Sequence, residues 1–221
     1  MRAWTAAVAS LLLALAPAPA LSRGQAPMAS AKPPVTIVAF GDSLTAGLGV
    51  AAAEAYPSDL KRDMARDGVR ARVVNLGISG DTTTDGLARV AQVEALHPAW
   101  VILEFGGNDG LRGVPVSRTE ANLQAIIRRL RRDRIGLLLV GMSLPPNYGP
   151  EYIHAFQAIY PALARRDHLP LVPFIYEDLA PKLKQDPGLL QGDGIHPTAA
   201  GCRIVAATIW RYLRPLLGRA E

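Results

Sequence analysis

The chain is poor in cysteine and in aromatic residues, and its most apolar segment is short. Cys202 is the single cysteine among 221 residues, so no disulfide can form within the chain. We expect Cys202 to be a buried, small apolar residue. Aromatic residues make up 6% of the sequence and do not alternate with the basic residues, which argues against a nucleic-acid-binding surface. The apolar run Ala6–Leu15 falls short of the roughly 20 residues that span a bilayer.

Several motifs that mark other functions are missing. No Gly-x-Gly-x-x-Gly turn or P-loop directly follows a candidate strand, which argues against a nucleotide-binding site. The nearest approach, Gly47–Ala52, fits the looser form ending in Ala but lies several residues past the first candidate strand. The Gly-x-Ser-x-Gly elbow of α/β-hydrolases is absent. His, Cys and carboxylate residues do not recur at ligand spacing, so we expect no metal site.

The positive charge has a local origin. The formal net charge is +5, and five basic residues cluster at Arg128, Arg129, Arg131, Arg132 and Arg134. They fall at the C-terminal end of a candidate helix, where cations complement the helix dipole. We interpret the cluster as a solvated helix end; the alternative is weak peripheral attraction to an anionic membrane surface.

The N-terminus has the pattern of a secretory signal. Arg2 precedes the apolar run, and Ala18 and Ala20 fit a small-x-small cleavage site. We therefore expect a signal peptide at residues 1–20, with an uncleaved anchor as the alternative. Residues 21–34 are rich in Ala, Pro, Ser and Gly and predict a flexible lead-in. The sequence thus predicts an exported protein, secreted or periplasmic where the cell has an outer membrane.

Strand and helix signals alternate over residues 35–217, which we expect to form one domain. The candidate strands are near-continuous apolar runs, typical of strands buried on both faces of a parallel sheet. They cover Val35–Phe40, Arg72–Asn75, Trp100–Phe105, Leu137–Val140 and, more weakly, Leu171–Phe174. Strands alternating with helices form right-handed βαβ units, so the sequence predicts an α/β fold, a three-layer α/β/α sandwich.

The clearest helix signal begins at Ser117. Ser117 and Glu120 have the spacing of a capping box. The residues with the spacing of one buried helix face are Leu123, Ile126, Ile127 and Leu130. Other candidate helices cover residues 54–66, 84–96, 152–166 and 198–213, and we expect Pro215 to stop the last one.

Polar residues flanked by glycine follow the candidate strands, where open α/β sheets place their sites. Gly41 permits a sharp turn after the first strand and precedes Asp42 and Ser43. We expect Ser43 at the first turn of the next helix, where the backbone N–H points outward and the dipole favours negative charge. Gly-Asp-Ser alone is more often a plain turn or N-cap. Ser43 is therefore a candidate nucleophile only if other segments supply a base and an orienting acid.

Two later segments could supply hydrogen-bond donors. Gly80, in the turn after the second candidate strand, could present an unobstructed N–H to a ligand. Asn108 follows Gly106 and Gly107 after the third candidate strand, and its amide carries two donors able to bind an oxyanion. All of these are also common turn residues, so neither segment is specific alone.

A candidate base lies near the C-terminus. The four histidines are His97, His154, His168 and His196, and only His196 follows an aspartate by three residues in a glycine-containing turn. That aspartate, Asp193, could hold one ring nitrogen while the other acts as a base. A surface loop or half of a metal site are the alternatives.

Taken together, these segments resemble the four blocks of the SGNH (GDSL) hydrolase family. The matching segments are Gly41-Asp42-Ser43-Leu44, Gly80, Gly107-Asn108-Asp109 and Asp193-x-x-His196, in this order. Three further segments resemble the bacterial branch of this family that contains thioesterases, arylesterases and lysophospholipases. They are Ile78–Thr82, residues 106–113 and Asn147-Tyr148-Gly149.

The resemblance implies a flavodoxin-like fold with a five-stranded parallel sheet and an enzyme without a cofactor. It implies that Ser43 is the nucleophile, His196 the base and Asp193 its orienting acid. It also implies an oxyanion hole made by the N–H groups of Ser43 and Gly80 and the amide of Asn108. We therefore expect a serine esterase that acts through an acyl-enzyme. Its partners would be small acyl ester, thioester or lysophospholipid substrates and no nucleic acid, and we expect a monomer.

A carbohydrate or small-acyl acetylesterase on the same scaffold is the main alternative. The residues that favour an acyl chain over a sugar are apolar: Leu111, Val114, Pro115, Val116, Leu144 and Pro145. The resemblance places the loop Gly110–Val116 beside the acyl chain. Pro146 and Val114–Arg118 depart from the family pattern, so they bear on chain-length preference. A non-catalytic nucleotide-binding α/β module is the other alternative.

Overall fold

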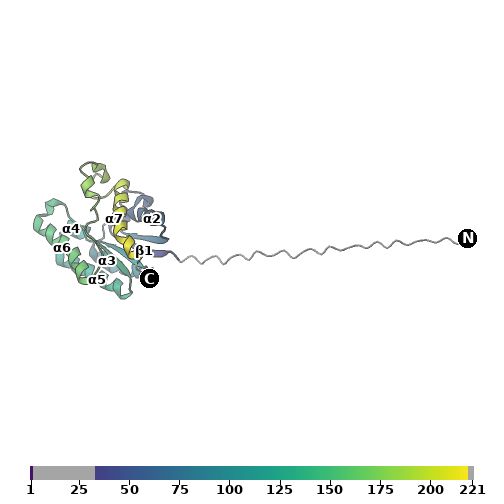
Figure 1. Ribbon diagram of the computed structural model, residues 1–221. Coiled ribbons are helices and arrows are strands. Elements are labelled where there is room, and N and C mark those ends of the chain that lie inside the picture. Colours follow the sequence, from purple (N-terminus) through teal and green to yellow (C-terminus); the bar gives the residue numbers. More distant parts are fainter. Residues whose placement is uncertain (2–32, 219–221) are drawn as a thin grey trace. The chain divides into compact units, whose positions relative to one another are not determined.

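The computed structural model describes Met1 and residues 33–218 (Figure 1). Five strands form one sheet in the order β2-β1-β3-β4-β5, and every neighbouring pair is parallel. They are β1 (Val35–Gly41), β2 (Ala71–Gly77), β3 (Trp100–Glu104), β4 (Gly136–Val140) and β5 (Leu171–Val172). This is the strand order of flavodoxin-like sheets, so the predicted five-stranded parallel sheet is confirmed. The weak fifth strand signal is correct in place but yields only two residues.

Helices cover both faces of the sheet (Figure 1). On one face α2 (Tyr56–Arg66) packs against α7 (Ala199–Leu217). On the other, α5 (Val116–Arg132) packs between α3 (Thr83–Glu94) and α6 (Pro150–Asp167). Right-handed crossovers in this strand order put the two groups on opposite faces, which gives the predicted α/β/α sandwich. The short elements are α1 (Ser43–Ala46), α4 (Gly107–Leu111), η1 (Ala52–Glu54), η2 (Pro146–Tyr148), η3 (Ala180–Lys182) and η4 (Pro187–Leu189).

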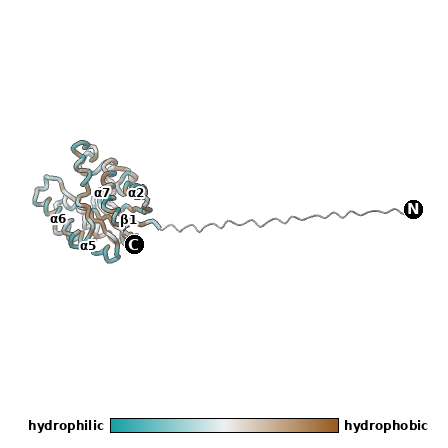
Figure 2. Tube along the Cα trace, viewed as in Figure 1, coloured by the Kyte–Doolittle hydropathy of each residue, from teal (hydrophilic) through white to brown (hydrophobic). Residues whose placement is uncertain are grey.

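The core is built from the apolar runs of the three central strands. Residues 37–40, 101–103 and 138–140 are buried, because helices cover both faces of β1, β3 and β4. Figure 2 shows the brown, apolar segments gathered inside the domain and the teal segments on its outer helices and loops. The edge strand β2 is only half-buried. Continuous rather than alternating hydrophobicity is what two covered faces require.

Helix α5 differs from its prediction at its start. Its N-cap is Pro115, no side chain caps it, and the predicted capping box at Ser117 is wrong. Pro115 has an extended ψ of 129° and the helix begins at Val116, so Ser117 is already the second helical residue and cannot be the N-cap. Glu120 instead pairs with Arg166 at 3.3 Å. The predicted buried face is confirmed by Leu123, Ile126, Ile127 and Leu130.

The end of the last helix also differs. Pro215 does not stop α7, which begins after its N-cap Thr198 and continues to Leu217. Pro215 lacks the N–H that would bond to the carbonyl of Arg211, and the loss of this one bond so close to the helix end leaves the last two residues helical. The other helix predictions agree with α2, α3 and α6 to within two residues at each end, except that Glu54 belongs to η1.

The arginine cluster lies at the C-terminal end of α5, as predicted. Arg129 donates two hydrogen bonds to Glu94 on α3, at 2.6 and 2.7 Å, and Arg131 contacts the Asp167 carbonyl. The remaining members, Arg128, Arg132 and Arg134, are exposed. The cluster is therefore in part an ion-pairing surface between helices and in part a solvated helix end.

Two expectations lie outside the described residues. Apart from Met1, the predicted signal peptide, 1–20, and all but the end of the lead-in, 21–34, belong to the residues that the structure does not describe. Among the helices of residues 33–218, none combines the length and the hydropathy needed to cross a membrane. Cys202 is buried and unpaired, as expected.

Candidate active site

Ser43 is the first residue of α1, directly beyond the C-terminal end of β1, as predicted. Asp42 is the N-cap, and its Oδ1 accepts the backbone N–H of Leu44 at 3.1 Å. Gly41 is still part of β1 and makes no left-handed turn. The prediction that Gly41 serves a sharp turn therefore differs from the structure. Glycine is needed there because a Cβ would overlap the hydroxyl of Thr45 and the carboxyl of Glu104.

The three residues predicted as a triad lie in contact with one another. Ser43 Oγ is 2.8 Å from His196 Nε2. His196 Nδ1 is 2.6 Å from Asp193 Oδ2. A carboxylate, an imidazole and a hydroxyl thus form one chain of hydrogen bonds, which is the arrangement that activates a serine.

The turn that carries Asp193 and His196 is held from within. Asp193 Oδ1 accepts the backbone N–H groups of Ile195 at 2.9 Å and of His196 at 3.0 Å. Burial raises the pKa of Asp193, but these bonds and the one to the imidazole outweigh it and lower the pKa to about 2. Asp193 is therefore ionised at neutral pH, and Gly194 supplies the left-handed φ of +69° that the turn needs.

The same loop is fastened to its neighbours. Tyr176 Oη donates to the carbonyl of Ile195 at 2.6 Å. The backbone N–H of Gln191 donates to the carbonyl of His196 at 2.8 Å, and Gln191 Nε2 donates to the carbonyl of Leu48 at 2.7 Å. These bonds fix the imidazole relative to Ser43, although 153 residues separate the two in sequence.

The predicted oxyanion donors line the same cavity as Ser43 and His196. Gly80 has a φ of +88°, so the turn needs glycine there, and only the guanidinium of Arg112 approaches the space where a Cβ would sit. Within the described part of the chain, no protein acceptor receives the backbone N–H of Ser43 or of Gly80. Both N–H groups are thus available to a ligand.

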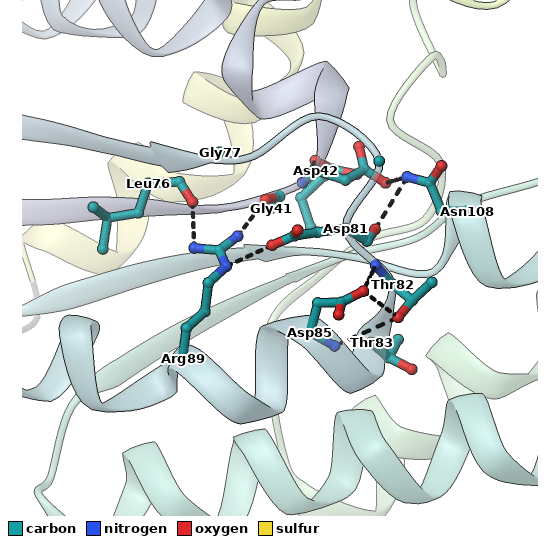
Figure 3. Close-up of polar contacts among 12 residues, drawn as sticks. Gly41, Asp42, Leu76, Gly77, Asp81, Thr82, Thr83, Asp85, Arg89 and Asn108 are labelled. Atoms are coloured by element: carbon teal, nitrogen blue, oxygen red, sulfur yellow. Dashed lines mark hydrogen bonds and ion pairs between the residues drawn. The ribbon is translucent and has the colours of Figure 1, made fainter.

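The amide of Asn108 is already engaged. Its Nδ2 donates to Asp42 Oδ2 at 3.2 Å and to the carbonyl of Asp81 at 3.0 Å (Figure 3). The sequence alone suggests two free donors, whereas the structure gives both hydrogens an acceptor. A ligand oxygen would have to displace or share one of these contacts, and the longer one is to Asp42.

Ser43 and His196 open on a cavity of about 490 Å³. Its walls are mostly apolar, and the predicted residues Leu111, Leu144 and Pro145 belong to them, together with Pro146. A wall that the sequence analysis missed comes from the segment after β5 and includes Phe174, Ile175 and Leu183.

Three residues predicted to face this cavity do not line it: Val114, Pro115 and Val116. The hydroxyl of Tyr152 binds the carbonyl of Val114 at 2.8 Å, and Pro115 and Val116 begin α5. The chain is therefore drawn toward α6 and the helix layer at this point. Only the start of the predicted loop, at Leu111, stays beside the cavity.

A second carboxyl group lies buried against the turn that carries Asp42 and Ser43. Glu104, at the end of β3, is fully buried, and its Oε2 accepts the N–H of Asp42 at 3.3 Å and the hydroxyl of Thr45 at 2.7 Å. Its Oε1 has no hydrogen-bond partner among residues 33–218. Burial, with the nearby Asp42, raises the pKa of Glu104 well above its usual value. Burial likewise raises the pKa of Asp42 to about 6.

Three contacts of the site were not predicted from the sequence. Glu104 lies buried against the turn at Ser43, Asp42 accepts a hydrogen bond from Asn108, and Tyr176 holds the loop that carries His196. A charged residue that closes a buried apolar strand is a signal that could have drawn attention to Glu104. As for metal chemistry, residues 33–218 contain no group of three or more His, Cys, Asp or Glu side chains arranged to hold an ion. His196 is engaged by Ser43 and Asp193 instead.

Comparison with known proteins agrees with this geometry. Residues 39–204 match the GDSL-like lipase/acylhydrolase family. The chain is 40% identical over 183 residues to esterase TesA of Pseudomonas aeruginosa, covering 82% of this chain and 89% of that protein. Identity to thioesterase 1/protease 1/lysophospholipase L1 of Escherichia coli K12 is also 40%, over 82% and 85% of the two chains. A crystal structure of TesA aligns with a TM-score of 0.76, covering 82% of this chain and 99% of that one. The chain therefore belongs to the GDSL-like lipase/acylhydrolase family and is a hydrolase of ester bonds.

Proposed function

We propose that this enzyme hydrolyses acyl esters, thioesters and lysophospholipids through an acyl-enzyme on Ser43. The observation that carries the proposal is the chain of hydrogen bonds from Ser43 through His196 to Asp193, placed at an apolar cavity. The names of its relatives, an esterase and a thioesterase with lysophospholipase activity, agree with it.

In the acylation step, Ser43 Oγ bonds to the acyl carbon while its proton passes to His196 Nε2. Asp193 holds the Nδ1–H and stabilises the imidazolium that forms. The carbonyl π electrons move to oxygen and create an oxyanion. When the tetrahedral intermediate collapses, the bond to the leaving alcohol or thiol breaks, and that group takes the proton from Nε2.

Deacylation repeats the steps with water. His196 Nε2 accepts a proton from water as the water oxygen bonds to the acyl carbon. The bond between that carbon and Ser43 Oγ then breaks, and Oγ recovers its proton from the imidazolium. The products are a carboxylic acid and the free enzyme.

The oxyanion would be bound by the N–H groups of Ser43 and Gly80 and by the amide of Asn108. The first two have no protein acceptor in the described residues, and all three line the cavity. Asn108 would exchange its longer contact, 3.2 Å to Asp42, for the oxyanion. Donors fixed before the reaction stabilise the transition state without reorganisation.

The cavity supports an acyl chain as the group bound next to the ester. Its volume of about 490 Å³ and its apolar walls, from Leu111 and Leu144 to Phe174 and Leu183, offer few partners for sugar hydroxyls. We therefore propose medium or long acyl chains rather than acetylated carbohydrates as substrates.

The proposed location rests on the N-terminal sequence, and a monomer is the state we expect. We propose that residues 1–20 are a cleaved signal peptide, that 35–217 form the one catalytic domain, and that the enzyme acts outside the cytoplasm as a monomer. The arginine cluster at the end of α5 would give at most weak contact with an anionic membrane. No metal, cofactor or nucleic acid is part of this proposal.

A p-nitrophenyl ester series from acetyl to palmitoyl tests the proposal. The wild type should be active, with its highest kcat/KM at medium or long chains, and Ser43→Ala should be inactive at every length. Activity confined to the acetyl ester would keep the mechanism and move the substrate to small or sugar esters. Full activity in Ser43→Ala, or none in the wild type, would contradict the proposal.

A further inference from the structure

We propose that Arg89 is a positioning residue that holds the oxyanion hole in its working geometry. The inference rests on the proposed function, since the hole has meaning only for acyl transfer at Ser43. Arg89 belongs to α3, its side chain is 10% exposed, and it does not line the cavity. Any effect of Arg89 on the reaction must therefore pass through the groups that it binds.

All three nitrogens of the Arg89 guanidinium bind groups at the edge of the sheet (Figure 3). Nε donates to Asp81 Oδ2 at 2.6 Å, Nη1 to the carbonyl of Leu76 at 2.8 Å and Nη2 to the carbonyl of Gly41 at 2.9 Å. Gly41 ends β1, and Leu76 lies one residue before the end of the adjacent strand β2. One side chain thus joins two strand ends to the turn after β2.

Each proposed oxyanion donor lies close to a group that Arg89 binds. Gly80 directly precedes Asp81 in the chain. The carbonyl of Asp81 accepts Asn108 Nδ2 at 3.0 Å. Ser43 follows Gly41 by two residues. Each of the three donors is therefore connected to a group that Arg89 binds by one hydrogen bond or by at most two residues of chain. Figure 3 shows the guanidinium on the opposite side of Asp81 from Asn108.

The shape of the guanidinium suits this task better than an ammonium would. Its Cζ lies over the ring of Phe40, 4.6 Å from the centroid, and over that of Phe105, 5.5 Å from the centroid. The two rings restrict its rotation while the planar group directs donors to three acceptors at fixed angles. A lysine could keep the charge but could not make the same set of bonds.

The turn after β2 has few other side-chain anchors. Arg112 donates to the carbonyl of Gly80 at 2.9 Å, but Arg112 is an exposed side chain. Ile78, at the start of the turn, is 46% exposed and packs little. Gly80 itself takes a φ of +88° and adds no side chain. The backbone N–H of Ile78 bonds to the carbonyl of Gly41 at 3.1 Å, and Asn108 holds the carbonyl of Asp81. The largely buried Arg89–Asp81 pair is the side-chain contact that joins this turn to both strand ends at once.

Loss of Arg89 should impair the transition state more than substrate binding. A misplacement of about 1 Å from a distant mutation can lower the rate about 10²-fold. Removing an oxyanion donor outright costs about 10²–10³-fold in kcat. Since Arg89 positions donors rather than supplying one, we expect an effect at or below the lower end of that range.

The test compares Arg89→Met, Arg89→Lys and a matched control on one p-nitrophenyl ester. Met keeps apolar contact with the two rings and removes every donor. We expect kcat to fall about tenfold to 10²-fold with KM changed less than about threefold, and Lys to recover only part of the loss. The control is Arg129→Met, which also removes an arginine bound to α3, at Glu94, and should keep the wild-type kcat.

Coupling to Asn108 separates positioning from general destabilisation. In an Asn108→Ala background, Arg89→Met should cost clearly less than in the wild type, because the amide that it positions is gone. An equal loss in both backgrounds, or a wild-type kcat in folded Arg89→Met, would overturn the proposal. If Arg89→Met does not fold, Asp81→Asn breaks the same ion pair, and a wild-type kcat there would be equally decisive. Activity in Ser43→Ala would instead show that the proposed function had failed.

Discussion

Asn108 Nδ2 donates to Asp42 Oδ2 at 3.2 Å, so the amide proposed to bind the oxyanion contacts the carboxyl group next to Ser43, the proposed nucleophile. A second bond, at 3.0 Å to the carbonyl of Asp81, holds the same amide from the other side. The two contacts orient the amide along the cavity wall before any substrate arrives. In the proposed mechanism, only the longer of the two contacts has to be shared with the oxyanion.

Replacing Asn108 should therefore damage catalysis and not the fold. We expect Asn108→Ala to remain folded, with kcat about 10²–10³-fold lower and KM changed little, because the lost donor acts mainly in the transition state. The measurement is steady-state kinetics together with circular dichroism. Asn122→Ala removes an amide that also makes two hydrogen bonds, to Thr83 and Thr84, and should keep its activity. Full activity in folded Asn108→Ala would refute the oxyanion assignment.

The buried carboxyl groups predict a pH-dependent stability. Burial raises the folded-state pKa values of Asp42, to about 6, and of Glu104. The folded state then binds protons more tightly than the unfolded state, so protonation of these two carboxyl groups stabilises the fold. This stabilisation is complete below the usual pKa values of 3.8 and 4.5. It is lost as the pH rises through the folded values. Each pKa unit corresponds to about 1.4 kcal/mol.

Glu104→Gln removes one of these two titrations and keeps the side-chain shape. We expect the free energy of unfolding, from urea curves at several pH values, to fall less steeply with rising pH in Glu104→Gln than in the wild type. Glu151→Gln, at an exposed position on α6, should keep the wild-type slope. Asp193 does not enter this comparison, because its lowered pKa of about 2 places its own loss of stability at more acid pH. Equal slopes in all three proteins would contradict the assignment.

The cavity predicts how chain length can be changed. Leu144 lines it and packs against Gly110, where even a Cβ would overlap the leucine side chain. A larger side chain cannot move toward α4 and must fill the cavity. We expect Leu144→Trp to lower kcat/KM for palmitoyl esters at least about tenfold and to leave acetyl esters nearly unchanged.

The control for chain length is Val114→Trp. Val114 is close in sequence to the cavity residues but does not line it, since Tyr152 holds its carbonyl toward α6. The chain-length profile of Val114→Trp, measured with the same ester series, should match that of the wild type. A shift in Val114→Trp and none in Leu144→Trp would mean that the acyl chain lies along the 110–116 loop instead.

The elements that place the site could be predicted because local sequence determines them. Continuous apolar runs mark strands buried on both faces, and their carboxyl ends meet at one edge of a parallel sheet. The segments around Ser43 and Asn108 each follow such a run, Gly80 follows the half-buried edge strand β2, and the structure brings the three segments together. The Asp193–His196 spacing is equally local, since one short turn brings the two side chains into contact.

Other parts depend on contacts that no spacing rule contains. The cavity wall formed by Phe174, Ile175 and Leu183 comes from turns and short 3₁₀ segments without hydrophobic periodicity. Arg89 reaches Asp81 and two strand ends from a helix, and only the assembled sheet edge makes those acceptors neighbours. Tertiary packing, rather than local propensity, determines these positions.

The central claim is that Ser43 is the nucleophile, and stoichiometric labelling tests it most directly. A p-nitrophenyl phosphonate ester should react once per chain, forming a bond between Ser43 Oγ and phosphorus and releasing one equivalent of p-nitrophenolate. Peptide mass spectrometry should place the adduct on Ser43, and Ser43→Ala should release nothing. An adduct on another residue, or continued ester hydrolysis by Ser43→Ala, would contradict the mechanism.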